Sequence, residues 1–391
     1  MESSYPIEVI EAQVRRVFAI EDITIGTSQQ PFIVRFGGRL VLDSMLAYDQ
    51  LSNQLKPLGC MPLFRVENER QVILIIPGVP EPKPSNPWIN GVLFFLTLIS
   101  VLVAGGYDPT QALPPNPFQA ALVIVSRGWP FAVSLLAILA AHEFGHYLMG
   151  RYHGVKVTLP YFIPFPLSAF GTMGAFINMK SLPKNRRDLF DIAIAGPLAG
   201  LIVAVPVLFI GLKLSTLTSL PNTGGWTLEG NSLLYMAAKF LAFGQMLPAP
   251  ADYTFTPLIQ WIVFYFTGSP APLGGMDVLL HPMAWAGWAG LLVTTMNLIP
   301  SGQLDGGHIF SVTLSRRAAQ IARIIILFVL FGLGFVWSGW WLWGALIFFI
   351  GGVQAEPLDQ ITPLGSTRKK LALLAIFIFL LTFTPVPLIG Y

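Results

Sequence analysis

The sequence predicts a polytopic α-helical membrane protein of about seven spans, preceded by a small N-terminal α/β domain that is soluble. Asp, Glu, Lys and Arg make up only 11% of the 391 residues, against about 25% in a typical soluble domain. The mean hydropathy of +0.65 agrees with this low charge. The charge is also unevenly placed, because ten of the 20 Asp and Glu residues lie before residue 84 and long uncharged stretches follow.

Residues 1–83 are expected to form the soluble domain and its linker, and residues 84–391 the membrane-embedded domain. The soluble domain is predicted to have the order α-β-α-β-β: a helix over residues 7–18, a strand over 32–36, a helix capped by Asp43 and ending at Leu55, and strands over 63–66 and 72–76. The polar residues 67–70 predict a hairpin turn between the last two strands. Residues 77–87, with five prolines, are the expected linker.

The spans are predicted from stretches without Asp, Glu, Lys or Arg, because one span needs about 20 residues. These stretches are residues 84–107, 128–141 with a continuation past Glu143, 192–212, 278–304, 324–355 and 371–391. The stretch 324–355 has 32 residues and contains Ser338-Gly339, so it is predicted to be a tight hairpin of two short helices. Residues 231–266 are apolar but broken by prolines. They form either a membrane hairpin or an interfacial segment, and the sequence leaves both open.

The positions of Lys and Arg predict the orientation of the spans. With seven alternating spans, three basic groups fall on one face: Arg151, Lys156, Lys180, Lys184, Arg186 and Arg187; Arg316, Arg317 and Arg323; and Arg368, Lys369 and Lys370. Such an excess marks the cytoplasmic side, so the N-terminal domain is expected in the cytoplasm and Tyr391 outside. The chain opens with neither a signal-peptide pattern nor a transit-peptide composition. The expected location is therefore a bacterial or archaeal plasma membrane.

Composition excludes several kinds of function. The net charge of +3 is small and the basic residues are scattered, which is not typical of a protein that binds nucleic acid. Cys60 is the single cysteine, so the chain has no internal disulfide framework and no multi-cysteine metal cage.

One motif carries chemistry, His142-Glu143-Phe-Gly-His146 at the end of the second predicted span. On a helix the two histidines lie at i and i+4, so both imidazoles project from one face and can bind one metal ion. Glu143 lies beside them and can accept a proton from water at that metal. The pattern arises by chance in roughly one chain in a hundred of this length. The alternative, a polar cluster that holds helices together, is disfavoured because such groups are costly inside an apolar span.

A hydrolytic zinc site needs three protein ligands and an open position for water. Asp305 is the leading candidate for the third ligand, because it lies at the cytoplasmic end of the fourth predicted span, at the depth of the two histidines. Asp305 is alternatively an N-cap of the helix that begins near Gly306. His308 is the rival ligand. His153 is expected to be solvated in a basic loop, and His281 to lie at the opposite face, too distant to reach the metal.

Together, two motifs resemble those of the site-2 protease family of intramembrane zinc metallopeptidases. They are His142-Glu-Phe-Gly-His146 and Asn297-x-x-Pro300-x-x-x-Leu304-Asp305-Gly306. The resemblance extends over residues 133–310 and includes Gly171-Thr-Met-Gly174 and the segment 185–200. No PDZ insertion is recognisable between the core spans. The small N-terminal domain is similar to that of cyanobacterial, archaeal and chloroplast members.

This resemblance implies a role for each motif residue and makes residues 84–391 a metalloprotease domain with a core at about 133–310. By it, His142, His146 and Asp305 are the ligands of Zn²⁺ and Glu143 is the general base. Asn297 is implied as a polar group near the tetrahedral intermediate of hydrolysis. The role of the N-terminal domain does not follow from the match.

The segment 159–180 is aromatic and apolar but interrupted by three prolines, so it cannot be a spanning helix. Its run 175–179 offers a strand edge to which an unwound substrate can add by backbone hydrogen bonds, and a plain membrane-surface loop is the equal alternative. The candidate substrate-binding residues are Gly171, Gly174, Ala175, Phe176, Ile177 and Asn178. The Gly196-Pro-Leu-Ala-Gly200 run of the third span predicts close helix packing or a bend.

The sequence therefore predicts an intramembrane zinc endopeptidase that cleaves single-span membrane proteins near the cytoplasmic leaflet. The family resemblance implies membrane-anchored transcription regulators among the substrates. The alternatives are a metal-ion transporter that uses the His and Asp cluster, and a catalytically silent relative that only binds membrane proteins. A transporter does not need Glu143 between the ligands and usually shows paired repeats, none of which is clear here.

Overall fold

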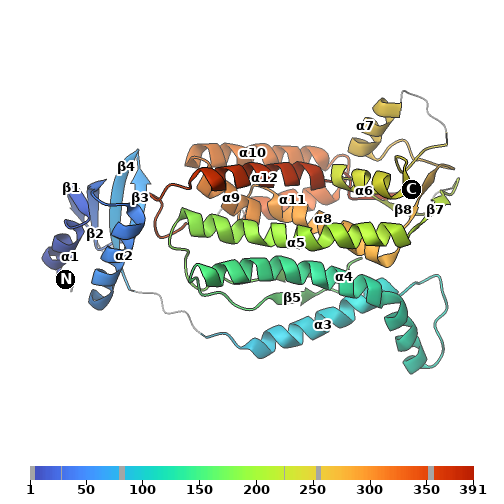
Figure 1. Ribbon diagram of the computed structural model, residues 1–391, viewed down its shortest axis with the longest axis horizontal. Coiled ribbons are helices and arrows are strands. Elements are labelled where there is room, and N and C mark those ends of the chain that lie inside the picture. Colours follow the sequence, from blue (N-terminus) through green and yellow to red (C-terminus); the bar gives the residue numbers. More distant parts are fainter. Residues whose placement is uncertain (1–4, 28, 79–83, 224, 252–256, 351–355) are drawn as a thin grey trace.

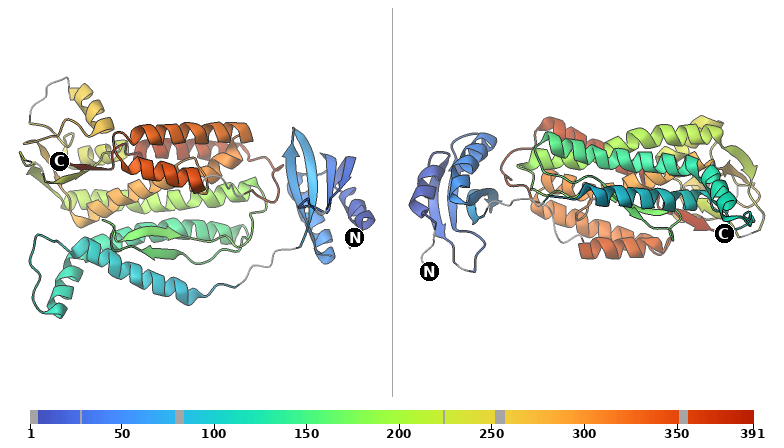
Figure 2. Two further views of the ribbon diagram at one scale, coloured as in Figure 1. Left: turned by 180° about the vertical axis from the view of Figure 1, so that it is seen from behind. Right: turned by 90° about the horizontal axis from the view of Figure 1, so that it is seen from below.

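The computed structural model describes residues 5–27, 29–78, 84–223, 225–251, 257–350 and 356–391. A small sheet domain lies at one end of an elongated bundle of helices, and the C-terminus lies at the opposite end (Figure 1). The other two views show the same separation of sheet domain and bundle (Figure 2). The predicted class, a mainly helical membrane protein with a small N-terminal α/β domain, is confirmed at this level.

The N-terminal domain packs two helices against one antiparallel sheet. Its elements are α1 (Ile7–Val14), β1 (Phe18–Ile25), β2 (Val34–Leu40), α2 (Ser44–Leu55), a 3₁₀ turn (Lys56–Leu58), β3 (Cys60–Glu67) and β4 (Arg70–Pro77). The strand order is β1-β2-β4-β3. Asp43 caps α2 as predicted, because its carboxylate accepts from the Met45 amide at 3.0 Å. Phe18, Phe36 and Phe64 are fully buried in the core of this domain.

The predicted order α-β-α-β-β is wrong in one element. The helix expected over residues 7–18 ends at Val14, and the undetected strand β1 begins at Phe18. β1 is an edge strand with a shift in register between Ile20 and Asp22, and most of its residues are exposed, so it lacks the alternation that identifies a strand. The predicted hairpin turn is confirmed, with positive φ at Asn68 (47°) and Glu69 (66°). Of the expected linker, residues 79–83 lie outside the described part of the chain.

In the bundle, helices lie at every predicted span. Three of the described helices are long and apolar enough to cross a membrane: α3 (Pro87–Gly106), α4 (Pro117–Tyr152) and α5 (Arg186–Leu214). Four others are shorter or more charged: α8 (Pro282–Leu298), α10 (Arg316–Leu333), α11 (Gly339–Ile350) and α12 (Ser366–Thr382). The pair α10 and α11 is the predicted tight hairpin, because α10 ends at Leu333 and α11 begins at Gly339.

The end of the bundle far from the N-terminal domain is closed by short elements. They are α6 (Leu233–Phe243), α7 (Pro257–Thr267), and the strand pairs β7 (Thr216–Ser219) with β9 (Met276–Leu279) and β8 (Thr227–Glu229) with β10 (Leu388–Gly390). α6 and α7 are short apolar helices of 11 residues each. Both alternatives for residues 231–266, a membrane hairpin and an interfacial segment, therefore stay open, and residues 252–256 lie outside the described part of the chain.

This cap is held together by buried charge. The Lys239 ammonium of α6 is fully buried and lies 3.2 Å from Glu229 Oε1 and 3.1 Å from Asp277 Oδ1. The Tyr235 hydroxyl donates to the same Glu229 oxygen at 2.8 Å. A buried cation is tolerated only when it is paired in this way, so the cluster ties α6 to both strand pairs.

The centre of the bundle is formed by α4, α5 and α8, which pack against one another, and by α9 (Asp305–Thr313), which packs on α5. A hairpin of β5 (Tyr161–Pro164) and β6 (Thr172–Phe176) lies against α3 and α4. The segment 159–180 is thus not a helix, as predicted. These elements position the residues of the candidate site.

Candidate metal centre

His142 and His146 lie on one face of α4, as the i, i+4 spacing predicts. Both side chains are buried, with exposures of 4% and 6%, and their Nε2 atoms lie 3.2 Å apart. Apolar residues of α4 just before them, such as Leu135 and Ile138, belong to the main core cluster of the bundle. The face of α4 that packs against its neighbours therefore also carries the two imidazoles.

Asp305 completes a triangle of ligand atoms. Its Oδ2 lies 3.2 Å from His142 Nε2 and 3.2 Å from His146 Nε2. Three ligands bound at about 2.0–2.1 Å to a tetrahedral Zn²⁺ would be separated by about 3.3 Å. The three side chains therefore fit a single metal ion, and they form the one such group of His, Cys, Asp and Glu among the described residues.

The local structure bears on the alternative roles that the sequence leaves open for Asp305 and His308. α9 begins at Asp305 itself, and Leu304 occupies the N-cap position, so Asp305 is not an N-cap. His308, the rival ligand, lies outside the triangle, and its buried Nδ1 has no hydrogen-bond partner among the described residues. His281 caps α8 at the end of that helix opposite Asn297, as predicted.

The orientation of His146 is set by α5. Its Nδ1 donates to the Ile192 carbonyl at 2.7 Å, and because a carbonyl only accepts, the proton must be on Nδ1. Nε2 is then left with its lone pair toward Asp305 and His142, which is the arrangement that a metal ligand requires. A Cβ on Gly196 of α5 would overlap the His146 ring, so the predicted close packing at the Gly196–Gly200 run is confirmed.

Glu143 and Asn297 also belong to this cluster. The Glu143 side chain is 5% exposed, and its carboxylate lies close to the Ile177 backbone, just after β6. Asn297 lies near the end of α8, and its Nδ2 is 3.4 Å from His142 Nε2. The structure thus brings together every residue that the two motifs singled out for ligand, base or polar roles.

The residues predicted to bind substrate line the same region. Gly171 and Gly174 have φ values of 72° and 101°, which favour glycine, and β6 spans Thr172–Phe176. The chain then continues to Asn178, whose carbonyl accepts from the Thr158 amide at 3.0 Å. Ala175 and Phe176 pair with β5 on one edge. The strand lies in place near Glu143, whereas substrate binding itself stays a prediction.

His153 was expected to be solvated, and that expectation is wrong. Its Nδ1 lies 3.1 Å from Asp188 Oδ1 and its Nε2 lies 3.1 Å from Asp191 Oδ2. The two hydrogen-bonded carboxylates raise the pKa of His153 to about 9. Asp191 also pairs with Arg368 at 2.6 Å. The available signal was the pair of acids at i and i+3 that directly precedes the uncharged stretch 192–212.

Comparisons with known proteins agree with this geometry. The model of the family "Peptidase family M50" matches residues 130–337. The chain is 30% identical over 328 residues to a protein of Oryza sativa subsp. japonica named "Probable zinc metalloprotease EGY1, chloroplastic", covering 78% of this chain and 52% of that protein. For the Arabidopsis thaliana protein of the same name the identity is 29% over 327 residues, covering 79% and 55%.

A third relative matches almost the whole chain. It is the A. thaliana "Probable zinc metalloprotease EGY2, chloroplastic", which is 28% identical over 395 residues, covering 98% of this chain and 66% of the relative. The chain spans about half the length of the first two relatives. The N-terminal domain is therefore included in the similarity to the third.

Proposed function

Because this chain belongs to peptidase family M50, the site-2 protease family that its motifs resemble, we propose that it is an intramembrane zinc endopeptidase. The observation that carries the proposal is the buried triangle of His142, His146 and Asp305 with Glu143 beside it. Two neutral imidazoles and one carboxylate are a typical ligand set for hydrolytic zinc, and three protein ligands leave a position for water.

Zinc bound to these three residues would supply a Lewis acid that activates water and polarises the scissile carbonyl. Glu143 is the group that accepts the proton of the attacking water and then passes it to the leaving amine. The Ile192 carbonyl fixes His146, and the Ile177 backbone lies close to the Glu143 carboxylate. Asn297 presents its amide on the same side as His142 Nε2, where it can donate to the oxyanion of the intermediate.

The substrate class is proposed to be single-span membrane proteins, with membrane-anchored transcription regulators as one kind. A transmembrane helix has all its backbone groups paired, so the segment to be cut must first unwind. A strand can hold such an extended segment by backbone hydrogen bonds. The position of Gly171–Asn178 supports this role, because the Ile177 backbone lies close to Glu143, the proposed base.

We propose seven spans, formed by α3, α4, α5, α8, α10, α11 and α12, with the N-terminal domain in the cytoplasm of a bacterium or archaeon. The three basic groups support this orientation. Lys184 and Arg187 of the first group contact Asp49 and Met45 of the N-terminal domain. The helices that carry the other two groups, α10 and α12, both begin at the end of the bundle nearest that domain (Figure 1). Reporter fusions at Leu182 and Arg317 should both report the cytoplasm. An external signal from either would contradict this topology.

The proposed activity is tested by Glu143→Gln, which keeps the size of the side chain but cannot accept the proton. Purified wild-type protein should contain zinc and cleave a single-span model substrate. The variant should retain zinc and lose activity by about a hundredfold or more. Cleavage at the wild-type rate by the variant would show that Glu143 is structural, and a wild-type protein without zinc or cleavage would refute the proposed function.

A further inference from the structure

A short segment near the C-terminus completes the sheet of the N-terminal domain. The Phe64 amide of β3 donates to the Leu358 carbonyl at 2.9 Å, and the Gln360 amide donates back to the Phe64 carbonyl at 3.0 Å. On its other side, the Leu358 amide donates to the Pro183 carbonyl at 3.0 Å and the Asp359 amide to the Lys184 carbonyl at 2.7 Å. Residues 357–362, the tie segment, therefore lie as a parallel strand between β3 and the residues that lead into α5.

Side chains fix the tie segment on both sides. Asp359 is 1% exposed, and its carboxylate accepts from the Ser44 hydroxyl at 2.7 Å, from the Ile361 amide at 2.7 Å and from the Thr362 hydroxyl. The Arg65 guanidinium of β3 donates to the Leu358 carbonyl at 3.0 Å. A buried carboxylate with this many donors holds a defined position. The N-terminal domain is thereby docked at one place, the N-terminus of α2 and the edge of β3.

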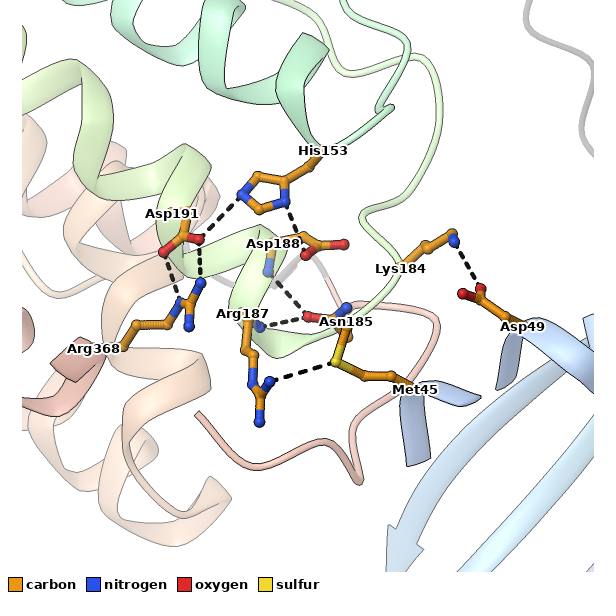
Figure 3. Close-up of polar contacts among 9 residues, drawn as sticks. All are labelled: Met45, Asp49, His153, Lys184, Asn185, Arg187, Asp188, Asp191 and Arg368. Atoms are coloured by element: carbon orange, nitrogen blue, oxygen red, sulfur yellow. Dashed lines mark hydrogen bonds and ion pairs between the residues drawn. The ribbon is translucent and has the colours of Figure 1, made fainter. Parts of the chain in front are cut away.

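Beside the tie segment, the contact between the domain and the bundle is polar and leaves a cavity that Asp359 also lines. A cavity of about 210 Å³ lies between Tyr48 and Asp49 of α2 and Tyr152, His153 and Asp188 of the bundle. Figure 3 shows the exposed ion pair at its rim, in which Lys184 Nζ lies 2.7 Å from Asp49 Oδ1. Polar interdomain contacts of this kind are compatible with reversible docking.

The first two turns of α5 gather contacts from the elements that carry the metal ligands. Asn185 caps the helix through the Arg187 amide at 2.8 Å, directly after the residues that pair with the tie segment. Arg186 Nε donates to the Val312 carbonyl of α9 at 3.1 Å. Asp191 contacts His153, which follows α4, and Arg368 of α12 (Figure 3). The next residue, Ile192, accepts the hydrogen bond from His146.

Hydrogen bonds to the tie segment, then the first two turns of α5, and then the His146–Ile192 hydrogen bond thus connect the N-terminal domain to a ligand of the candidate metal centre. We propose that the docked N-terminal domain positions His146 through the tie segment and the start of α5, so that Asp359 and Arg65 are positioning residues for the reaction. Release of the domain frees the start of α5 to shift, and the Ile192 carbonyl shifts with it. The inference rests on the proposed function, because His146 is there a zinc ligand.

The test uses the full-length protein and two sets of variants. Arg65→Ala combined with Asp359→Ala removes polar side-chain contacts of the tie segment, while Leu358 and Ile361 still pack on the core of the domain. Asp359→Asn is the conservative variant that keeps one acceptor oxygen. Arg35→Ala is the matched control, because Arg35 is in the same sheet but pairs only within the domain, with Asp22 and Glu67. Asp49→Lys and Lys184→Asp reverse an exposed ion pair without disturbing any core, and the double exchange restores it.

Three measurements are made on each variant: backbone hydrogen exchange in peptides that cover 60–67 and 356–362, the visible spectrum of the Co²⁺-substituted protein, and kcat and KM on a single-span substrate. Arg65→Ala with Asp359→Ala should speed hydrogen exchange in both peptides and alter the Co²⁺ bands. It should also lower kcat about tenfold and leave KM unchanged, because changes to residues behind the metal ligands have effects of at least this size. Asp359→Asn and the double charge exchange should recover most of kcat, and Arg35→Ala should match the wild type.

Faster exchange in the two peptides with unchanged Co²⁺ bands and unchanged or higher kcat would overturn the inference, while the protease would stand. If the variant with both alanines fails to fold, the single variants Asp49→Lys and Lys184→Asp decide. If charge repulsion in these variants undocks the N-terminal domain without a loss of kcat, the inference is overturned equally. Failure of the proposed function itself is recognised separately, because the wild type would then neither bind metal nor cleave substrate.

Discussion

Gly196 on α5 faces His146 on α4 so closely that a side chain at this glycine would occupy the space of the imidazole. Four residues earlier, the Ile192 carbonyl accepts the hydrogen bond from the same ring. One helix therefore supplies both the room for a proposed zinc ligand and the acceptor that orients it.

Gly196→Ala is expected to displace the His146 ring and to lower zinc affinity and turnover about tenfold or more, because outer-shell changes have effects of this size. Gly91→Ala in α3 is the matched control, since a Cβ there meets no atom within 4 Å and should change neither quantity. Zinc content after dialysis against a chelator measures the first effect. Equal zinc retention by the two variants would contradict the close approach of α5.

Substitution of Asp305 tests whether it, rather than the nearby His308, is the third metal ligand. Asp305→Ala should lower zinc content and activity together, because the triangle loses one of its three donors. His308→Ala is the control, because His308 lies outside that triangle, and it should keep its zinc. Metal analysis of the purified variants decides between them. Loss of zinc from His308→Ala but not from Asp305→Ala would assign the third ligand to the histidine.

Much of this site was predictable from the sequence, because its parts are local. The spacing of His142 and His146 on a helix fixes their common face, and Glu143 follows from the same turn. Asp305 was predictable only by the depth of its span and by family resemblance, since its contact with α4 crosses 159 positions from His146. No local pattern records such a contact.

The fold was predictable where periodicity or lack of charge marks an element, and not elsewhere. The uncharged stretches located the helices of the bundle, whereas β1 was missed because an exposed edge strand with a bulge has no regular alternation. His153 was misjudged for a related reason. Its partners Asp188 and Asp191 are on the next helix, α5. The sequence of the intervening hairpin of β5 and β6 does not indicate that α5 begins beside His153.

His153 should make stability depend on pH. Its pKa is raised to about 9 by Asp188 and Asp191, while a His in an unfolded chain titrates near ~6.5. Because the folded value is the higher one, the stabilisation is complete below about pH 6.5 and is lost as the pH rises through about 9. The Tm of the protein in detergent should therefore fall between pH 7 and 9.5, and His153→Gln should flatten that fall. An identical pH profile in the variant would rule out this contribution.

Lys239 tests the buried cluster at the other end of the bundle. Lys239→Ala leaves Glu229 and Asp277 buried without their cation, and breaking a buried pair in this way costs about 3–5 kcal/mol. Lys213→Ala removes an exposed lysine of α5 near the same end and should cost less than about 1 kcal/mol. Thermal unfolding of both variants measures the difference. Similar Tm values would mean that the cap does not depend on this cluster.

The tie segment also sets an order of events during synthesis. Ser44 and Asp359, which are bonded in the finished protein, are 315 positions apart. At ribosomal rates of 5–20 residues per second, the edge of β3 waits about 15–60 s for its partner strand. An uncovered strand edge pairs readily with other chains, so the nascent domain is vulnerable to aggregation throughout this interval. A chain truncated before residue 357 keeps the open edge permanently, so its N-terminal domain should stay prone to pairing with other chains.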